Sequence, residues 1–303
     1  MPTILVVGSL HHDIMIETDH LPRPDETAVG RRWYPKFGGK GGNQAIAAAR
    51  AGAATRMFGA VGADDFGRSL RATLKSGGVD HRFVATLPDH GSGMSVALSL
   101  PNGDYAATIV SGANLALDPA GLDDPALWQD VALLLLQNEV PETINLAAAT
   151  AARRRGLRVL LNAAPARPLP DALRAAVDIL IVNAVEAAMM GGGDVRDLPS
   201  ALYAAQSLAD PGQTVIVTAG SHGLALAGGG VAPLSLPAPK VIVQSTHGAG
   251  DCFCGALAAA IVQGADLHSA CHTATARAAA HVAGHVAGHG EKNAKGISHI
   301  PTA

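Results

Sequence analysis

The chain has 303 residues, 48% of them hydrophobic and 16% charged, and its formal net charge at pH 7 is −3. This length and apolar content suffice for one large core or two smaller ones, and they exclude an intrinsically disordered chain. The slightly acidic balance provides no basic surface for nucleic acid, so no nucleic-acid partner is expected.

The sequence also lacks signals for export and membrane insertion. The apolar run that ends at Gly8 is too short for a signal peptide, and no stretch of about 18 apolar residues could cross a bilayer. Cys252, Cys254 and Cys271 are odd in number and form no Cys-x-x-Cys pair, which indicates reduced thiols rather than disulfides or a zinc site. We therefore expect a cytoplasmic protein with no membrane partner.

Strands and helices alternate along most of the chain. Apolar, β-branched runs predict strands at residues 4–7, 55–61, 131–136, 158–162, 179–182 and 214–218, with short strands continuing to 241–243. Helical periodicity predicts helices at residues 42–51, 65–76, 142–155 and 198–209, a helix through Glu186, and two alanine-rich helices after residue 248. Strands that alternate with helices form a mostly parallel sheet with helices on both faces, so the sequence predicts an α/β fold.

Two segments interrupt this alternation. Residues 14–37 and 94–111 have alternating apolar and polar side chains and many turn residues, a pattern typical of short antiparallel strands. In the second segment, strands at 94–100 and 105–110 are joined around Asn102-Gly103, a strong hairpin signal. No linker or internal repeat divides the chain. We expect a single domain over residues 1–303, in which these segments form a small β subdomain over the site.

A glycine-rich turn lies between the strand expected at 241–243 and the first alanine-rich helix. Its sequence is Ser245-Thr246-His247-Gly248-Ala249-Gly250-Asp251. The small residues at 248–250 allow backbone N–H groups to approach an anion at the positive end of the helix dipole. Asp251 would repel a phosphate unless it had a chemical role, such as accepting the proton of a hydroxyl group. The alternative is an ordinary acidic residue in the first turn of a helix.

Two common nucleotide-binding motifs are absent from the sequence. It contains neither Gly-x-x-x-x-Gly-Lys-Ser/Thr nor Gly-x-Gly-x-x-Gly, which argues against a P-loop nucleotide hydrolase and weakens the case for a dinucleotide oxidoreductase. A kinase of another fold would still need a base, an anion-binding turn, a nucleotide cleft and a metal ion.

A second glycine-rich segment, Gly38-Gly39-Lys40-Gly41-Gly42-Asn43-Gln44, precedes an apolar helix. Its glycines leave room for the polar groups of Lys40 and Asn43 to point into a pocket. Asp13 and Glu139 stand near strand ends, where their carboxylates can accept hydrogen bonds from the adjacent hydroxyls of a sugar. Lys40 could instead be a solvated turn lysine, and Glu139 a residue near the start of a helix.

In order and spacing, these segments resemble the ribokinase (PfkB carbohydrate kinase) family over about residues 3–262. The resemblance also includes Gly8-Ser9 with Asp13, Asn162-Ala163-Ala164-Pro165-Ala166, Asn183 with Glu186, and Thr218-Ala219-Gly220-Ser221-His222-Gly223. It implies a ribokinase-like, three-layer Rossmann-type domain with a mostly parallel sheet, and a small β-sheet lid that also forms a homodimer contact. It further implies an ATP- and Mg²⁺-dependent kinase that phosphorylates the hydroxymethyl group of a small sugar, with D-ribose at O5 as the expected acceptor.

The resemblance also implies roles for individual residues. Asp251 is the expected catalytic base, and the N–H groups of Gly248, Ala249 and Gly250 are expected to stabilise charge on the transferring phosphoryl group. The expected sugar contacts are His11, Asp13, Gly39, Lys40, Asn43, Glu139 and Asp251. The expected ATP contacts are Asn183, Glu186, Thr218, Gly220, Ser221, Gly223 and Gly250. Glu186 is also expected to hold Mg²⁺ through water, because this ion keeps most of its hydration shell.

Two positions depart from the family pattern. Ribokinases usually have Asn where this chain has His11, so another furanose, such as a nucleoside or fructose, is an alternative acceptor. Ser245 replaces an aspartate that helps to hold a monovalent cation, and residues 288–296 offer Glu291 as the only nearby acid. Potassium is therefore a doubtful cofactor, and weak potassium activation is expected. A sugar- or nucleotide-binding regulator without turnover is a further alternative, which the intact Asp251 disfavours.

The last part of the chain contains His281, His285 and His289, spaced four residues apart. On an unbroken helix they would share one face, as metal ligands do. Gly284 and Gly288 weaken such a helix, so we expect a polar helix face rather than a metal site.

Overall fold

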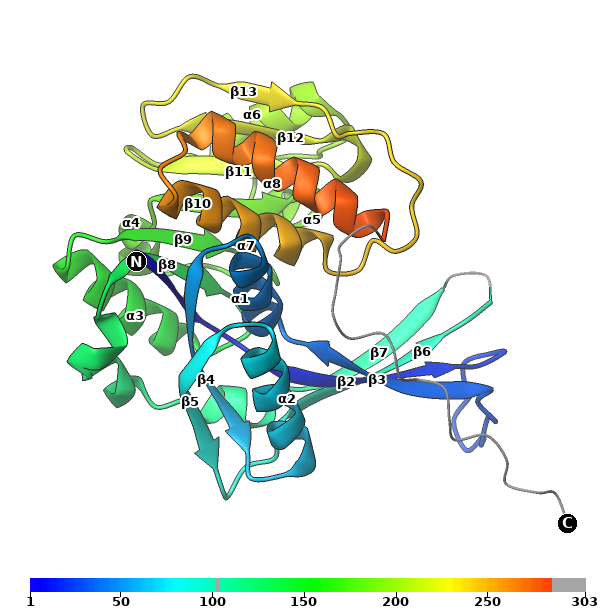
Figure 1. The fold of residues 1–303 in the computed structure, drawn as a ribbon. Helices are drawn as coiled ribbons and strands as arrows, with labels where there is room; N and C mark the ends of the chain where they lie inside the picture. Colours follow the sequence, from blue (N-terminus) through cyan, green and yellow to red (C-terminus); the bar gives the residue numbers. More distant parts are fainter. Residues whose placement is uncertain (102–103, 285–303) are drawn as a thin grey trace, which may run out of the picture.

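Residues 1–101 and 104–284, which the computed structural model describes, form two β-sheets (Figure 1). The larger sheet contains, in spatial order, β13 (Leu234–Leu236), β12 (Leu224–Gly228), β11 (Thr214–Thr218), β10 (Ile179–Asn183), β9 (Arg158–Asn162), β8 (Val131–Gln137), β1 (Thr3–Val7), β4 (Ala54–Gly62) and β5 (Asp80–Leu87). The smaller sheet contains β3 (Arg32–Gly38), β2 (His11–Glu17), β6 (Gly93–Ser99) and β7 (Tyr105–Val110), again in spatial order. In the larger sheet, the neighbouring strands β11, β10, β9, β8, β1, β4 and β5 run parallel to one another. Strands β12 and β13 pair antiparallel at one edge of that sheet. The predicted α/β fold with a mostly parallel sheet is therefore confirmed, as is the second small sheet.

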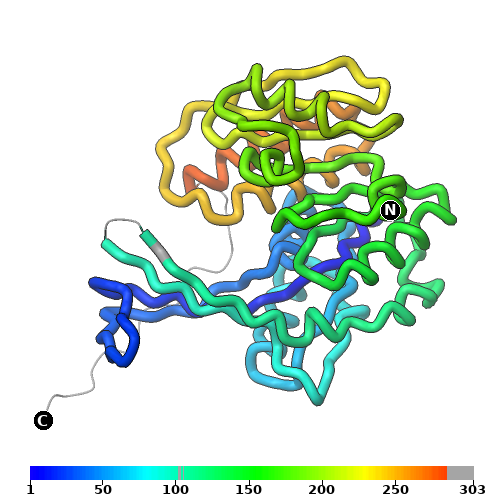
Figure 2. The backbone as a smooth tube through the Cα atoms, turned by 180° about the vertical axis from the view of Figure 1, so that it is seen from behind, coloured from blue at the N-terminus to red at the C-terminus, as the bar shows by residue number. Residues whose placement is uncertain are grey.

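Helices cover both faces of the larger sheet (Figures 1 and 2). One face packs against α1 (Lys40–Arg50), α2 (Asp65–Ser76), α7 (Ala249–Val262) and α8 (Leu267–Val282). The other face packs against α3 (Glu142–Arg154), α4 (Asp171–Ala176), α5 (Ala184–Met189) and α6 (Leu198–Leu208). Within the described ranges, no helix combines the length and the apolar character needed to cross a membrane.

The central strand β1 explains why both faces are covered. Successive side chains of a strand point to opposite faces of its sheet. Ile4 and Val6 therefore pack in the core beneath α1 and α7, whereas Leu5 and Val7 pack in the core beneath α3. All four side chains are fully buried, so a continuous apolar run is required at this position.

The smaller sheet projects from the side of the larger one (Figures 1 and 2). Its strand β2 begins at His11, separated from the end of β1 by Gly8, Ser9 and Leu10. Strand β2 pairs antiparallel with β3 and parallel with β6. This short connection places the first residues of β2 at the carboxyl edge of the larger sheet, where parallel α/β sheets bind their ligands.

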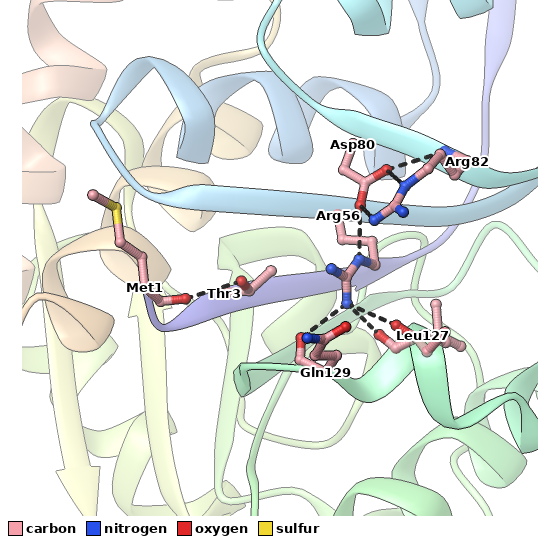
Figure 3. Close-up of polar contacts among 8 residues, drawn as sticks. Met1, Thr3, Arg56, Asp80, Arg82, Leu127 and Gln129 are labelled. Carbon is pink, nitrogen blue, oxygen red and sulfur yellow. Dashed lines mark hydrogen bonds and ion pairs between the residues drawn. The ribbon is translucent and has the colours of Figure 1, made fainter.

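An ion pair between buried Arg56 and half-buried Asp80 holds the outer strand β5 to the rest of the molecule (Figure 3). The Nε of Arg56 on β4 donates to Oδ2 of Asp80 at 2.9 Å, and its Nη1 donates to the carbonyl oxygens of Leu127 and Gln129 at 2.7 and 3.0 Å. Asp80 also accepts hydrogen bonds from Arg82. These guanidinium groups, Arg82 first, hold the pKa of Asp80 well below its usual range.

Some elements differ from the expectation. The strand expected at 241–243 is wrong: these residues are irregular, and Ile242 is 88% exposed. The sheet ends at β13, and Pro237 and Pro239, which follow it, have no N–H groups to extend a ladder. Helix α1 begins at Lys40 rather than at residue 42. Strand β5, helix α4 and short 3₁₀ helices between residues 112 and 128 were not predicted.

Candidate active site

The carboxyl ends of the central strands and the first turns of α1, α5 and α7 enclose a cavity of about 190 Å³, called here the smaller cavity. It brings together residues from five separate parts of the sequence. Those predicted as site residues are Lys40, Asn183, Glu186, Thr218, Gly248, Gly250 and Asp251. The position agrees with the general rule that open α/β sheets bind ligands at the carboxyl ends of their strands.

Asp251 lies in the first turn of α7 and is 9% exposed. Its Oδ2 accepts a hydrogen bond from Nδ2 of Asn43 at 3.1 Å, and its Oδ1 accepts one from Nε2 of Gln44 at 3.0 Å. Burial raises the pKa of Asp251, against the opposing influence of the Lys40 charge and of these two amides. A buried carboxylate with a raised pKa is a stronger proton acceptor than an exposed one.

Lys40 is the first residue of α1, and both its backbone and its side chain contribute to the site. Its N–H donates to Oε2 of Glu139 at 2.8 Å, and the hydroxyl of Ser9 donates to the same oxygen at 2.5 Å. Glu139 thus lies at the positive end of the α1 dipole, where a carboxylate is stabilised. Burial by itself lowers the pKa of Lys40, but the carboxylates of Asp251, Glu139 and Glu186 outweigh it and raise that pKa, so the ammonium stays charged.

Glycines allow β2 to lie close to the start of α1. Gly39 has φ 84°, and a Cβ there would lie 2.8 Å from the backbone nitrogen of His11. A Cβ at Gly38 would lie 2.1 Å from Oδ2 of Asp13. Any other residue would push the strand and the turn apart, so the glycines bring His11 and Asp13 beside the Lys40 turn.

The two β2 residues differ in how their polar atoms are satisfied. Asp13 accepts a hydrogen bond from the hydroxyl of Ser95 at 2.5 Å. His11 is 4% exposed, and its Nε2 has no hydrogen-bond partner in the described part of the chain. Buried polar atoms are normally hydrogen-bonded, so this unpartnered nitrogen is an exception among the described residues.

The glycine-rich turn before α7 has a well-defined shape. Gly248 is the N-cap of α7 with φ 79°, which a side chain would strain, and α7 begins at Ala249. Gly248 and Gly250 line the smaller cavity. The N–H of Ala249, in contrast, donates to the carbonyl of Thr246 at 3.2 Å, and Ala249 lines a neighbouring cavity instead. Of the three expected phosphoryl-binding residues, the structure therefore places two at the smaller cavity.

The turn is held by the end of α8. The backbone N–H groups of Gln244 and Ser245 donate to the carbonyl of Val282 at 2.9 and 3.3 Å. His281 Nε2 donates to the carbonyl of His247 at 2.9 Å, which fixes the proton on that nitrogen. Ser245 itself is exposed, and its hydroxyl oxygen accepts a hydrogen bond from the His247 N–H at 3.3 Å.

Of the three histidines spaced four residues apart, His281, His285 and His289, only His281 lies in the described part of the chain. His281 lies on α8, whereas His285, His289, residues 288–296 and Glu291 lie outside the described residues. Within residues 1–101 and 104–284, no group of three or more His, Cys, Asp or Glu side chains is arranged to hold a metal ion.

Asn183 and Glu186 form the start of α5. The Asn183 side chain accepts the Glu186 N–H at 2.8 Å, and Oε2 of Glu186 accepts the Asn183 N–H at 2.8 Å. This reciprocal capping orients Glu186 into the smaller cavity. Burial raises the pKa of Glu186, although the Asn183 N–H and the Lys40 charge oppose this.

A second cavity of about 540 Å³, called here the larger cavity, adjoins the first. The two share Thr218, Gly250 and Phe253. Gly220, Ser221 and Gly223, also predicted as ATP contacts, lie in its wall. Its other wall residues are mainly apolar and include Val241, Val243, Ala278 and Ala279, and this size and lining suit an aromatic base.

Several site residues were not predicted. Thr275 on α8 lines the larger cavity, and its buried hydroxyl has no partner in the described ranges. Gln44, Gln137 and Asn162 form a buried chain of amides that ends at Asp251. Gln44 could have been identified from the sequence, because it is a polar residue among the apolar positions of α1. Nothing in the local sequence distinguishes Thr275 from other helical threonines.

Comparisons with known proteins agree with this geometry. A family model described as pfkB family carbohydrate kinase matches residues 1–293. Ribokinase from Haemophilus influenzae is 32% identical over 263 residues, which cover 86% of each chain. Deoxyribokinase from Salmonella typhimurium is 33% identical over 270 residues, which cover 88% of each chain. The solved structure of Arabidopsis thaliana ribokinase complexed with ribose and ATP matches with a TM-score of 0.83 at 30% identity, covering 93% of this chain and 92% of that one.

Proposed function

The chain belongs to the pfkB family of carbohydrate kinases and is an ATP-dependent sugar phosphotransferase, and from this premise we propose that it phosphorylates D-ribose at O5 to give ribose 5-phosphate. The observation that carries the proposal is the buried Asp251 carboxylate, which lines one cavity with Lys40 and the first residues of α7. A base, a cation and a helix N-terminus in one cavity are the groups that phosphoryl transfer to a hydroxyl requires.

In the proposed reaction, the hydroxymethyl oxygen of the sugar lies against Asp251. Asp251 accepts the hydroxyl proton while the oxygen forms a bond to the γ-phosphorus and the bond from that phosphorus to ADP breaks. The dipole of α7 and the N–H groups at Gly248 and Gly250 stabilise the negative charge on the phosphoryl oxygens. The charged ammonium of Lys40 contributes to the same cavity.

The sugar is proposed to bind on the β2 side of Asp251. Asn43 already donates to Asp251, and Glu139 and Asp13 carry carboxylate oxygens that can accept from sugar hydroxyls. The Gly38 and Gly39 turn lies next to β2, so a sugar there would meet Asp13, His11 and the start of α1 together.

ATP is proposed to place its base in the larger cavity and its phosphates in the smaller one. Thr218 and Gly250 line both cavities, so a single nucleotide can extend from one into the other. Glu186 fits a magnesium role, because it is a hard oxygen ligand that faces the phosphate side of the smaller cavity together with Lys40. When bound there through water, Mg²⁺ would neutralise charge on the phosphate oxygens. We expect this ATP-dependent reaction to take place in the cytoplasm.

Ser245 fits a monovalent cation less well. Its side chain is a neutral hydroxyl, whereas the related kinases are expected to have a carboxylate at this position. The hydroxyl oxygen also already accepts a hydrogen bond from the His247 N–H. Potassium therefore has a minor role in the proposed function.

A second acceptor, 2-deoxy-D-ribose, is supported by two observations. His11 occupies the sugar side of the site with an unpartnered Nε2, and the chain is as similar to a deoxyribokinase as to ribokinases. A ring in place of the expected Asn changes both the shape and the hydrogen bonding of the pocket near the sugar.

The smaller sheet is proposed to act as a lid and as the contact of a homodimer. It projects from the body (Figures 1 and 2), and it exposes Trp33 on β3 and Ile109 and Val110 on β7. Exposed apolar side chains on a projecting sheet favour burial against another copy of the same sheet.

The full-length protein, ATP and a panel of acceptors test the proposal. ADP release would be measured with D-ribose, 2-deoxy-D-ribose, D-fructose and adenosine, and the phosphorylated carbon would be assigned by ¹³C–³¹P coupling. We expect ribose to have the highest kcat/KM and to be phosphorylated at O5. Rapid turnover of a nucleoside with none of ribose would reject the ribose assignment, and no turnover with any acceptor would reject the catalytic role.

A further inference from the structure

A chain of buried amides connects the carboxylate of Asp251 to the central sheet. Nε2 of Gln137 on β8 donates to Oε1 of Gln44 at 2.8 Å. Nε2 of Gln44 on α1 donates both to Oδ1 of Asp251 and to Oδ1 of Asn162, each at 3.0 Å. Asn162 on β9 in turn donates to the carbonyl of Ile181 at 3.2 Å.

The two groups at the ends of this hydrogen-bond network, the Ile181 carbonyl and the Asp251 carboxylate, determine the orientation of its amides. The carbonyl of Ile181 can only accept, so Nδ2 of Asn162 faces it and Oδ1 faces Gln44. An ionised Asp251 can also only accept, so Nε2 of Gln44 must face both carboxylate and Asn162. Both hydrogens of the Gln44 amide are thereby used, and its oxygen is left to accept from Gln137.

Gln44 and Asn43 contact the same carboxylate but differ in their surroundings. Asn43 is half-buried and lies on the proposed sugar side, so its amide is shared with the substrate. Gln44 is fully buried, and its amide has no access to a substrate. The hydrogen bond from Gln44 can therefore persist while the sugar enters and leaves.

We propose, on the premise of the proposed function, that Gln44 is a positioning residue: its amide, held by Gln137 and Asn162, fixes the orientation in which the Asp251 carboxylate accepts the proton of the acceptor hydroxyl. Catalytic groups must be held within small angular limits of the productive geometry, and a side chain locked by its own hydrogen bonds supplies such support. The Gln44 amide uses both of its hydrogens and its oxygen, whereas Oε1 of Gln137 is buried without a hydrogen-bond partner in the described ranges. The network also joins Asp251 on α7 to strands β8 and β9, which lie in the middle of the larger sheet.

The charged and titratable groups around Asp251 must be considered in any pH measurement. They are Lys40 on α1, Glu139 after β8, Glu186 on α5, and Cys252 and Cys254 on α7. Replacing Gln44 by an uncharged residue alters none of them, so a change in the pH profile of such a variant reports the lost amide.

The first test replaces Gln44 by methionine, which keeps the length of the side chain and removes its hydrogen bonds. We expect Gln44→Met to lower kcat by about 10- to 100-fold, the loss associated with one hydrogen bond to a charged group. KM for sugar and ATP should change by less than about threefold. The acidic limb of the kcat profile should move up by about one pH unit, because the lost bond favoured the ionised carboxylate.

Gln213→Met is the matched control. Gln213 is also buried, and its Nε2 donates to the carbonyls of Arg174 and Val177 at the amino end of β11, away from the site. We expect both Gln213→Met and Gln44→Met to lower the thermal stability, because each removes buried hydrogen bonds, but only Gln44→Met to shift the acidic limb of the kcat profile. If both variants lose activity only in proportion to stability and keep the wild-type pH profile, Gln44 has a structural role alone.

A second variant, Gln44→Glu, tests the proposal if Gln44→Met does not fold. Gln44→Glu keeps the shape and still accepts from Gln137, but its carboxylate repels Asp251, so the pH limb should move further than in Gln44→Met. An unchanged limb in this variant would overturn the proposal.

A ¹³C NMR titration of the Asp251 carboxyl distinguishes the proposed role of Gln44 from the proposed function of the protein. The Asp251 signal is assigned as the one that is missing from the spectrum of Asp251→Asn. A raised pKa of Asp251 in the Gln44 variants supports positioning even if no acceptor is phosphorylated, which would reject only the proposed function. An unaltered pKa rejects the role of Gln44 even in an active kinase.

Discussion

Asn43 and Asp251 are 208 positions apart in the sequence, yet Nδ2 of Asn43 donates a hydrogen bond to Oδ2 of Asp251 at 3.1 Å. The contact joins the two glycine-rich segments of the chain, one at the start of α1 and the other at the start of α7. A side chain proposed to bind sugar therefore touches the proposed base directly. In the proposed reaction, this contact would link the binding of the acceptor to the placement of the group that deprotonates it.

The first prediction concerns the base. Asp251→Asn should lower kcat by a factor on the order of 10² to 10⁴, because an amide cannot accept the hydroxyl proton, while KM for sugar and ATP stays within several-fold. The orientation of Gln44 is fixed, so the oxygen of the introduced amide should face Gln44 and its NH₂ should face Asn43, whose half-buried amide would turn its own oxygen toward it. Steady-state kinetics on folded protein checks this, and near-normal kcat would remove Asp251 from the base role.

The second prediction concerns acceptor choice. His11→Asn should shift relative kcat/KM toward ribose and away from the other acceptors by about 3- to 10-fold, the range of one hydrogen bond gained or lost. His12→Asn is the control, because the neighbouring strand residue points to the opposite face and stacks on Phe66 at 4.3 Å. Equal effects of the two substitutions would show that His11 does not contact the sugar.

The third prediction concerns monovalent ions. Because Ser245 lacks the charge of a carboxylate, which is worth roughly 1 to 4 kcal/mol at contact distance, potassium should activate the enzyme only weakly. Initial rates would be compared in sodium, potassium and caesium salts at equal ionic strength and fixed Mg²⁺ and ATP. Strong, saturable activation by potassium in the wild type would show that Ser245 does not disable the site. Ser245→Asp should increase ion dependence if the later part of the chain supplies further oxygen ligands.

The fourth prediction concerns the nucleotide. Thr275→Val should raise KM for ATP by about 3- to 10-fold without a comparable change in KM for the sugar, because it removes a buried hydroxyl from the larger cavity. Thr273→Val, on an exposed position of the same helix, is the control. An unchanged KM for ATP in Thr275→Val would place the base of the nucleotide elsewhere.

The fifth prediction concerns stability. Asp80→Asn should reduce the free energy of unfolding at pH 7 by about 1.5–3 kcal/mol, because buried Arg56 loses a charged partner. Hydrogen bonds from Arg82 and Arg56 depress the folded pKa of Asp80, so this contribution is complete above the unfolded pKa, about 4, and is lost as the pH falls through the folded value.

Urea unfolding of wild type and variant at pH 7, 5 and 3 measures the difference. It should be constant between the first two values and smaller at the third. Asp65→Asn, which breaks the exposed Asp65–Arg68 pair on α2, should change stability by less than about 1 kcal/mol. A difference in Asp80→Asn that grows with acidity would contradict the assignment.

The sequence alone was sufficient for the α/β class, most of the central strands and the gathering of many of the site residues in one place. Strand and helix predictions depend on local runs and spacings of side chains, and Ile4 to Val7 form the short continuous apolar run typical of a central parallel strand. The two glycine-rich segments were also readable, because positions such as Gly39 and Gly248 need a backbone conformation that other residues avoid.

Tertiary structure decided the contacts between distant segments. Glu139 accepts from the first N–H of α1 rather than serving the helix that follows it, and Gln44 bridges two strands and Asp251. The apolar run at 241–243 has strand-like residues but forms no strand, because the sheet has already ended and the run lines the larger cavity instead. Such outcomes depend on which surfaces meet in the folded chain, and a local pattern of side chains contains no information about that meeting.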